Sequence, residues 1–328
     1  MHEPQIILAE PSGFPAESLD LLRQVGRVTL CEPSRAALIE AIPPAEVLWV
    51  RLGHKIDAEL MAKAPALSLI VTATTGLNHI DLKAAEQHGI EVISLKGKTD
   101  FLKDVRATSE HTIGLMLALI RHLPAAGAEV ISGGWRRDPY QGTEIYGKTV
   151  GLFGYGRLGK IVARYLRAFD AEVLVTDPLL DQGFVAEGIG SVKPEELLGR
   201  SDIVSVHVDL RDETKGFFGA PLFKAMKSGA FFINTSRGEL IDEAALLDGL
   251  ESGAIRGAAL DVLSNEQTRG MGESALVKYA QEHHNLIITP HIGGCTVESM
   301  GKAEHFLAQE LYATLHRWAG KEAVASAR

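Results

Sequence analysis

The chain has few cysteines, no excess of positive charge and no long apolar run. Its two cysteines, Cys31 and Cys295, lie outside any Cys/His cluster, so neither a disulfide framework nor a metal site is expected. Acidic residues outnumber basic ones by 42 to 33, and the net charge of -9 argues against binding to nucleic acid or anionic membranes. No basic stretch followed by an apolar run opens the chain, and the apolar run Leu115–Ile120 is too short to span a membrane. We therefore expect a cytoplasmic protein.

What the chain does contain is enough apolar sequence for two domain cores, 46% of 328 residues. Short apolar strands at 5–8, 47–50, 69–71 and 92–93 alternate with helical patterns. A long helix is predicted over 108–132 and a last one over 297–318. Between them, six strands are predicted at 149–153, 172–176, 203–207, 231–234, 258–262 and 286–288. Such alternation predicts parallel α/β sheets, and the six-strand series matches a complete doubly wound nucleotide-binding sheet.

A glycine-rich turn begins that second series. Gly154, Gly156 and Gly159 follow the apolar strand Val150–Phe153, and a helical pattern comes directly after them. The first glycine permits a tight turn, the second lets a pyrophosphate approach the backbone, and the third lets helix and strand pack closely. The next strand ends at Asp177, whose carboxylate suits ribose hydroxyls and repels a 2′-phosphate. The sequence therefore predicts NAD as the cofactor.

Three side chains with suitable chemistry follow later strands. Reduction of a 2-keto acid requires a group that holds the carboxylate, a group that polarises the carbonyl and a proton donor. Arg237 suits the first two roles because its planar guanidinium binds oxygens in pairs. His291 suits the third, with Glu266 to orient it. Ligands of parallel α/β sheets lie beyond the carboxyl ends of the strands, which is where these residues are predicted.

Several segments, taken in order, resemble motifs of the D-isomer-specific 2-hydroxyacid dehydrogenases, and most closely those of phosphoglycerate dehydrogenases. They lie at 75–81, 110–112, 144–151, 201–207, 234–242, 259–262 and 289–294. The resemblance implies a flavodoxin-like substrate domain, residues 1–104 and 295–328, with a Rossmann NAD-binding domain, residues 105–294, inserted in it. It also implies a homodimer formed through about residues 105–148. The C-terminal regulatory domain of many phosphoglycerate dehydrogenases is not expected in a chain of 328 residues.

The resemblance also implies roles for individual residues. Arg237, Glu266 and His291 would be catalytic: Arg237 binds the substrate, His291 transfers the proton, and Glu266 pairs with His291. The implied cofactor-binding residues are Gly154, Gly156, Arg157, Leu158, Gly159, Asp177, His207, Val208, Thr235, Ser236, Asp261 and Gly294. Among these, Asp261 would hold the nicotinamide carboxamide. Substrate contacts would come from Arg51, Thr75, Gly76, Arg237 and His291, with Arg51 on a distal anionic group such as a phosphate or phosphonate.

Departures from the family pattern leave alternatives open. Gln267 stands where a proline commonly follows the catalytic glutamate, the strand-end pattern His-x-Pro is replaced by 207–209, and the segment 268–282 is atypical. Glyoxylate or hydroxypyruvate reduction and phosphite-type oxidation remain alternatives to a phosphoglycerate-like reaction. An NAD(H)-sensing protein resembling the C-terminal binding protein corepressors is the alternative from another class.

Overall fold

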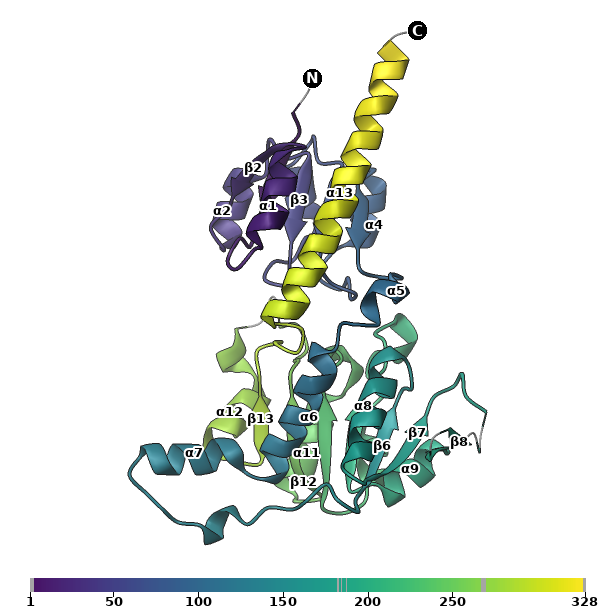
Figure 1. Cartoon of the computed structure of the whole chain (residues 1–328). Coiled ribbons are helices and arrows are strands. Elements are labelled where there is room, and N and C mark those ends of the chain that lie inside the picture. The colour runs from purple at the N-terminus through teal and green to yellow at the C-terminus, as the bar shows by residue number, and fades with distance from the viewer. Residues whose placement is uncertain (1–2, 182, 184, 187, 267–269, 327–328) are drawn as a thin grey trace. The chain divides into compact units, whose positions relative to one another are not determined.

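The computed structural model describes residues 3–181, 183, 185–186, 188–266 and 270–326 (Figure 1). The chain divides into two compact units, one formed by Met1–Val105 with Thr296–Arg328 and the other by Arg106–Cys295. The division lies one residue from each domain boundary predicted above. The assignment of the units to substrate and cofactor stays a prediction.

The first unit is built on a five-stranded parallel sheet of order β2-β1-β3-β4-β5. Its strands are β1 (Gln5–Leu8), β2 (Arg27–Leu30), β3 (Val47–Val50), β4 (Leu69–Thr72) and β5 (Glu91–Ser94). Its helices are α1 (Ala16–Arg23), α2 (Arg35–Ala41), α3 (Ala58–Ala62), α4 (Leu82–Gln87), α5 (Thr99–Leu102) and α13 (Val297–Ser326). The order is the flavodoxin-like one.

Both faces of this sheet are buried. Successive residues of a strand point to opposite faces, so each strand contributes side chains to two cores. Ile6 and Leu8 of β1 belong to the core that α1 and α13 complete. Ile7, between them, belongs to the core completed by α2, α3 and α4. The strand β2 was not predicted, because its sequence contains no run of apolar residues. Such a sequence suits its position at the edge of the sheet, where its residues are exposed apart from the half-buried Val28.

The second unit contains an eight-stranded sheet of order β13-β12-β11-β10-β6-β7-β9-β8, parallel except for β8. Its strands are β6 (Thr149–Phe153), β7 (Glu172–Thr176), β8 (Val185–Ala186), β9 (Ile189–Ser191), β10 (Ile203–Val206), β11 (Ala230–Asn234), β12 (Ile255–Leu260) and β13 (Leu286–Ile288). The order reverses beside β6, as in a doubly wound nucleotide-binding sheet. The predicted fold class, two doubly wound parallel sheets, is confirmed; in this unit the short strands β8, at the edge, and β9, beside it, were missed.

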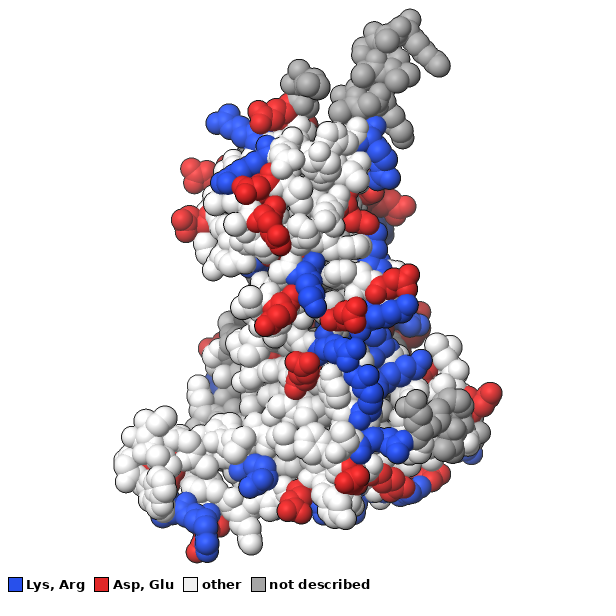
Figure 2. Space-filling view, viewed as in Figure 1, with Lys and Arg blue, Asp and Glu red and all other residues white. Residues whose placement is uncertain are grey.

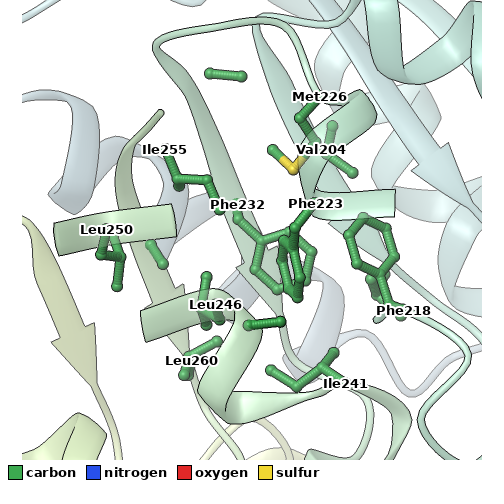
Figure 3. Packing of buried hydrophobic residues seen from close by; sticks show 14 of the residues in the cluster. Val204, Phe218, Phe223, Met226, Phe232, Ile241, Leu246, Leu250, Ile255 and Leu260 are labelled. Carbon is green, nitrogen blue, oxygen red and sulfur yellow. The ribbon is translucent and has the colours of Figure 1, made fainter. Parts of the chain in front are cut away.

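Helices cover both faces of this sheet: α6 (Ala107–Ile120) and α8 (Arg157–Ala168) on one, and α9 (Pro194–Arg200), α10 (Ala220–Ala225), α11 (Glu243–Glu251) and α12 (Ala275–Glu282) on the other. The core between the sheet and helices α9 to α12 is partly aromatic. The ring centroid of Phe218 lies 4.7 Å from that of Phe223 and 4.9 Å from that of Phe232, and Figure 3 shows these rings among aliphatic side chains. This packing fixes the strands whose ends carry the candidate site.

The prediction of one helix over 108–132 is wrong. The chain breaks at His122, whose φ is 53°, into α6 and α7 (Leu123–Ile131). Pro124 explains the break, because a proline inside a helix lacks the N–H donor and clashes with the carbonyl four residues before it. Among the described residues no single helix is long and apolar enough to cross a membrane. The segments Thr99–Ile120 and Leu123–Ile131 reach that length and composition only as a pair, bent by 63°.

Candidate functional site

Two of the three glycines in the glycine turn are in close contacts that leave no room for a side chain, and the third faces open space. Gly154 has a φ of 95°, and a Cβ there would lie 2.5 Å from the carbonyl oxygen of His207. A Cβ on Gly159 would lie 2.3 Å from the carbonyl oxygen of Gly154, so only glycine lets α8 pack this tightly on the turn. A Cβ on Gly156 would meet nothing within 4 Å. The space in front of Gly156 can therefore receive a ligand group that a side chain would displace.

Helix α8 starts directly at this turn and presents donors there. Its N-cap is Gly156, which provides no side-chain acceptor, so the first N–H groups, those of Arg157 and Leu158, suit a phosphate. The predicted phosphate contacts thus lie where the helix dipole is positive. Lys160, Arg164 and Arg167 are exposed farther along α8, and Figure 2 shows Lys and Arg side chains gathered over this helix.

Asp177, the residue after β7, is held against the glycine turn. Its Oδ2 accepts a hydrogen bond from the backbone N–H of Tyr155 at 2.8 Å, and its Oδ1 accepts one from that of Leu179 at 2.9 Å. Each oxygen can accept a further bond, since a carboxylate has about four acceptor positions. The turn and the carboxylate are therefore one assembly, with acceptors beside the phosphate donors, as a ribose next to a pyrophosphate requires.

The ends of β10 and β11 bring four predicted cofactor residues to the same edge of the sheet. His207 follows β10, and its Nε2 lies 2.9 Å from Ser205 Oγ. Burial lowers the pKa of His207 to about 4, so the ring is neutral at physiological pH. Val208 comes next and is half-buried. Thr235 and Ser236 follow β11, and Ser236 Oγ donates to the carbonyl of Val206 at 2.8 Å, joining the two strand ends.

His291 and Glu266 form a direct pair. The ring Nδ1 of His291 contacts Glu266 Oε1, and 18% of each side chain is exposed. The pair leaves the ring Nε2 as the nitrogen from which a proton can be given to a ligand. His291 has a φ of 54°, a left-handed conformation that costs a residue with a side chain roughly 1–2 kcal/mol. Such strained residues cluster at functional sites.

Arg237 lies next to the loop that carries Glu266. A Cβ on Gly238 would lie 2.1 Å from the carbonyl carbon of Leu263, so the two loops are in close backbone contact. Arg237 donates from Nη1 to the carbonyl of Ser236 at 2.6 Å. Burial lowers the pKa of Arg237, and neighbouring carboxylates, Glu266 first among them, oppose this change. The guanidinium thus stays a cation close to the His291–Glu266 pair.

Asp261 has less freedom to bind the nicotinamide than the prediction supposed. Its side chain is 1% exposed, and Oδ1 accepts from Thr289 Oγ1 at 2.6 Å, from the N–H of Ile292 at 2.9 Å and from His111 Nε2 at 3.1 Å. Oδ2 accepts from the N–H of Gly293 at 2.7 Å. Only Oδ2 has room for another donor. Gly294, beyond this turn, is exposed.

The predicted substrate residues Arg51, Thr75 and Gly76 lie in the first unit, after β3 and β4. Thr75 is exposed, and the carbonyl of Gly76 accepts from Thr74 Oγ1 at 2.8 Å. Arg51 already has an anionic partner, since its Nε lies 2.5 Å from Oε1 of Glu304, whose side chain is 1% exposed.

Ser12 and Glu10 also contact the segment of Arg51. Its Nη1 donates to the carbonyl of Ser12 at 2.7 Å, and the carboxylate of Glu10 accepts from the backbone N–H groups of Arg51 at 2.5 Å and Gly53 at 2.8 Å. Sequence reasoning missed Glu304, which is 253 residues away in α13 and belongs to no motif. Gln267, noted above as a departure, and residues 268–269 lie outside the described part of the chain.

Comparison with known proteins finds relatives in the family that the sequence motifs resemble. Residues 113–293 match the family model described as D-isomer specific 2-hydroxyacid dehydrogenase, NAD binding domain. The D-3-phosphoglycerate dehydrogenase of Mycobacterium tuberculosis is 36% identical over 280 residues, 85% of this chain and 51% of that protein. The enzyme of the same name from Archaeoglobus fulgidus is 34% identical over 310 residues, 94% and 56% of the two chains. The chain thus spans about half the length of these curated relatives.

Solved structures show the same fold over most of the chain. The TT0316 protein of Thermus thermophilus has 30% identity and a TM-score of 0.80, covering 95% of this chain and 97% of that one. The D-lactate dehydrogenase of Aquifex aeolicus, solved with NAD and lactic acid, has 26% identity, a TM-score of 0.81 and 95% coverage of both chains. The predicted family and its NAD-binding domain are confirmed.

Proposed function

Because the chain belongs to the D-isomer specific 2-hydroxyacid dehydrogenase family, we propose that it transfers hydride reversibly between NAD and a D-2-hydroxy acid or its 2-keto acid. One observation carries the proposal: Glu266, His291 and Arg237 lie on neighbouring loops at the strand-end edge of the sheet that also carries the glycine turn. A proton donor, its orienting carboxylate and a carboxylate-binding cation are the groups that reduction of a 2-keto acid requires.

The residues divide the work as follows. NAD, when bound, supplies the hydride acceptor or donor. The N–H groups of Arg157 and Leu158 would hold its pyrophosphate, with Asp177 on the ribose. Arg237 binds the substrate carboxylate and polarises the carbonyl oxygen. His291 gives a proton from Nε2 to that oxygen in reduction and removes it in oxidation, while Glu266 orients the ring through Nδ1.

The substrate's tail would lie at the first unit's predicted substrate residues. The relatives named D-3-phosphoglycerate dehydrogenase support a second anionic group, which Arg51 would bind together with the loop of Thr75 and Gly76. The ion pair between Arg51 and Glu304 counts against it, because a phosphate would have to compete with a buried carboxylate. Substrates with and without a charged tail therefore both belong in the assay.

The assembly we propose is a homodimer formed through the segment 105–148. Large apolar side chains in this segment are unusually exposed: Leu123 55%, Val130 49%, Ile131 90%, Trp135 87% and Tyr146 69%. They lie on α7 and the loop after it, which project from the second unit in Figure 1. Exposed apolar surface of this kind is typical of an interface. Ile131→Glu should shift the mass measured by light scattering from dimer to monomer.

The test of the reaction is NADH oxidation against a panel of 2-keto acids: glyoxylate, hydroxypyruvate, pyruvate and a phosphorylated 2-keto acid. Phosphite oxidation is tested separately, by following the reduction of NAD. We expect turnover with at least one 2-keto acid. His291→Ala should lower kcat by about 10²–10⁴-fold while the Kd for NADH is unchanged. The exposed His284→Ala is the matched control and should keep full activity. Tight NADH binding without turnover across the panel would instead favour the NAD(H)-sensing alternative.

A further inference from the structure

Asp261 is the main hydrogen-bond acceptor for the turn that carries His291. Three consecutive N–H groups, those of His291, Ile292 and Gly293, all donate to Asp261. The first goes to its backbone carbonyl at 2.8 Å, the second to Oδ1 at 2.9 Å and the third to Oδ2 at 2.7 Å. The turn includes the left-handed His291, a conformation that persists only where the surroundings determine it. The carboxylate of Asp261 provides two of the contacts that do so, and the carbonyl of Thr289 adds one by accepting from the N–H of His291 at 3.0 Å.

Asp261 in turn depends on α6. His111, in the second turn of that helix, places its Nε2 3.1 Å from both Asp261 Oδ1 and Thr289 Oγ1. Thr289 Oγ1 donates its hydroxyl proton to Asp261 Oδ1 at 2.6 Å, so Oγ1 can only accept from His111. Asp261 Oδ1 is also an acceptor, and the Nε2 of His111 that faces both oxygens must therefore carry a proton. The side chain of His111 is 20% exposed, against 1% for Asp261. His111 thus supplies an N–H donor to a buried carboxylate.

The packing around the turn is equally close. A Cβ on Gly293 would lie 2.8 Å from Asp261 Oδ2, 3.3 Å from Thr108 Cγ2 and 3.6 Å from His111 Cδ2. The turn therefore rests directly on the first turns of α6. Burial raises the pKa of Asp261, but the hydrogen bonds from His111, Thr289 and the turn outweigh it and lower the pKa below its ordinary value. The bonds thus favour the ionised form, which accepts from all of its donors at once.

We propose that His111 is a positioning residue for the reaction: through Asp261 and Thr289 it holds the 291–293 turn in the conformation that aims the ring of His291. The inference rests on the proposed catalytic role of His291. It also gives Asp261 a task besides the predicted nicotinamide contact, since most of its acceptor positions serve the turn. His111 touches neither His291 nor Glu266 by any contact described above, so its effect on the ring of His291 passes through Asp261, Thr289 and the turn.

The test compares His111→Leu, which removes the donor, with His111→Gln, whose side-chain amide can place an N–H near the same position. We expect His111→Leu to lower kcat for 2-keto acid reduction by about 10–100-fold, because misplacing a reacting group by about 1 Å costs up to 10²-fold. The Kd for NADH should change by less than about threefold, and His111→Gln should recover most of the lost kcat. The control His284→Leu, at an exposed histidine of the same unit, should match the wild type.

A second readout needs neither cofactor nor turnover. Hydrogen exchange of the amides of residues 291–293 should be about tenfold faster in His111→Leu than in the wild type, and close to wild type in His111→Gln. Unchanged exchange and unchanged kcat in a folded His111→Leu variant would overturn the proposal, as would a glutamine variant no better than the leucine one. A wild-type protein without any turnover would refute the proposed function, yet the exchange result would still decide whether His111 holds the turn.

Discussion

The contribution of the ion pair between Arg51 and Glu304 to the free energy of unfolding of the first unit can be predicted and measured. Glu304 is 1% exposed, and its Oε1 lies 2.5 Å from Arg51 Nε, so Arg51→Leu leaves a buried carboxylate without its cation. Removing one partner of a buried pair costs about 3–5 kcal/mol. The negative charge of Glu10 repels the ionised Glu304 and so destabilises the folded state further once Arg51 is removed. We expect the free energy of unfolding of this unit to fall by that amount at pH 8.

The loss should depend on pH in a defined direction. Burial raises the pKa of Glu304, and Arg51 opposes this, so the pKa rises further in Arg51→Leu. A carboxyl whose folded pKa is raised favours the folded state at low pH and loses that contribution as pH rises through the folded pKa. The difference between Arg51→Leu and the wild type should therefore be smaller at pH 5 than at pH 8. The double variant Arg51→Leu/Glu304→Leu should recover much of the stability, since no buried charge remains.

The assay is urea unfolding followed by tryptophan fluorescence, with Trp49 as a probe because it is fully buried two residues before Arg51. Lys98→Leu is the matched control. Its partner Glu310 also lies on α13, but both side chains are about a third exposed, so the expected loss is at most ~1 kcal/mol. A loss in Arg51→Leu no larger than in the control, or one equal at pH 5 and pH 8, would refute the reasoning.

Three further outcomes follow from the site. Glu304→Gln should raise kcat/KM for a phosphorylated 2-keto acid relative to a 2-keto acid without a charged tail, because it removes the carboxylate that competes for Arg51; an unchanged ratio in the substrate panel would mean that Arg51 does not bind the substrate's tail. Asp177→Ala should weaken NADH binding and narrow the preference over NADPH, since it removes the carboxylate that repels a 2′-phosphate; fluorescence titrations with both cofactors measure this, and an unaltered preference would mean that the ribose is read elsewhere. Because the pKa of His207 is lowered to about 4, its neutral form stabilises the fold above pH ~6.5, and up to ~3 kcal/mol should be lost as pH falls toward 4. Urea midpoints of the wild type should therefore fall more steeply with acidity than those of His207→Gln, and parallel curves would contradict the assignment.

Much of the fold was predictable because its signals are local. Buried parallel strands are continuous apolar runs, and strand-end positions follow from them, so the places of Gly154, Asp177 and His291 after their strands were predicted correctly. The exceptions have separate physical causes. The edge strand β2 has few buried residues, and the break at His122 follows from Pro124, a local signal that the apolar pattern of the surrounding helix concealed.

The sequence by itself determined the two-sheet architecture, the glycine turn and the three chemical groups, because each depends on residue type and on neighbours within a few positions. Only the tertiary structure decided what those groups touch. Arg51 meets Glu304 across 253 residues, and Asp261 meets His111 across 150. No local pattern encodes such contacts, since they exist only once helices α13 and α6 pack against their sheets. In both cases a charged group that the sequence assigned to a ligand proved to be held by the protein's own side chains.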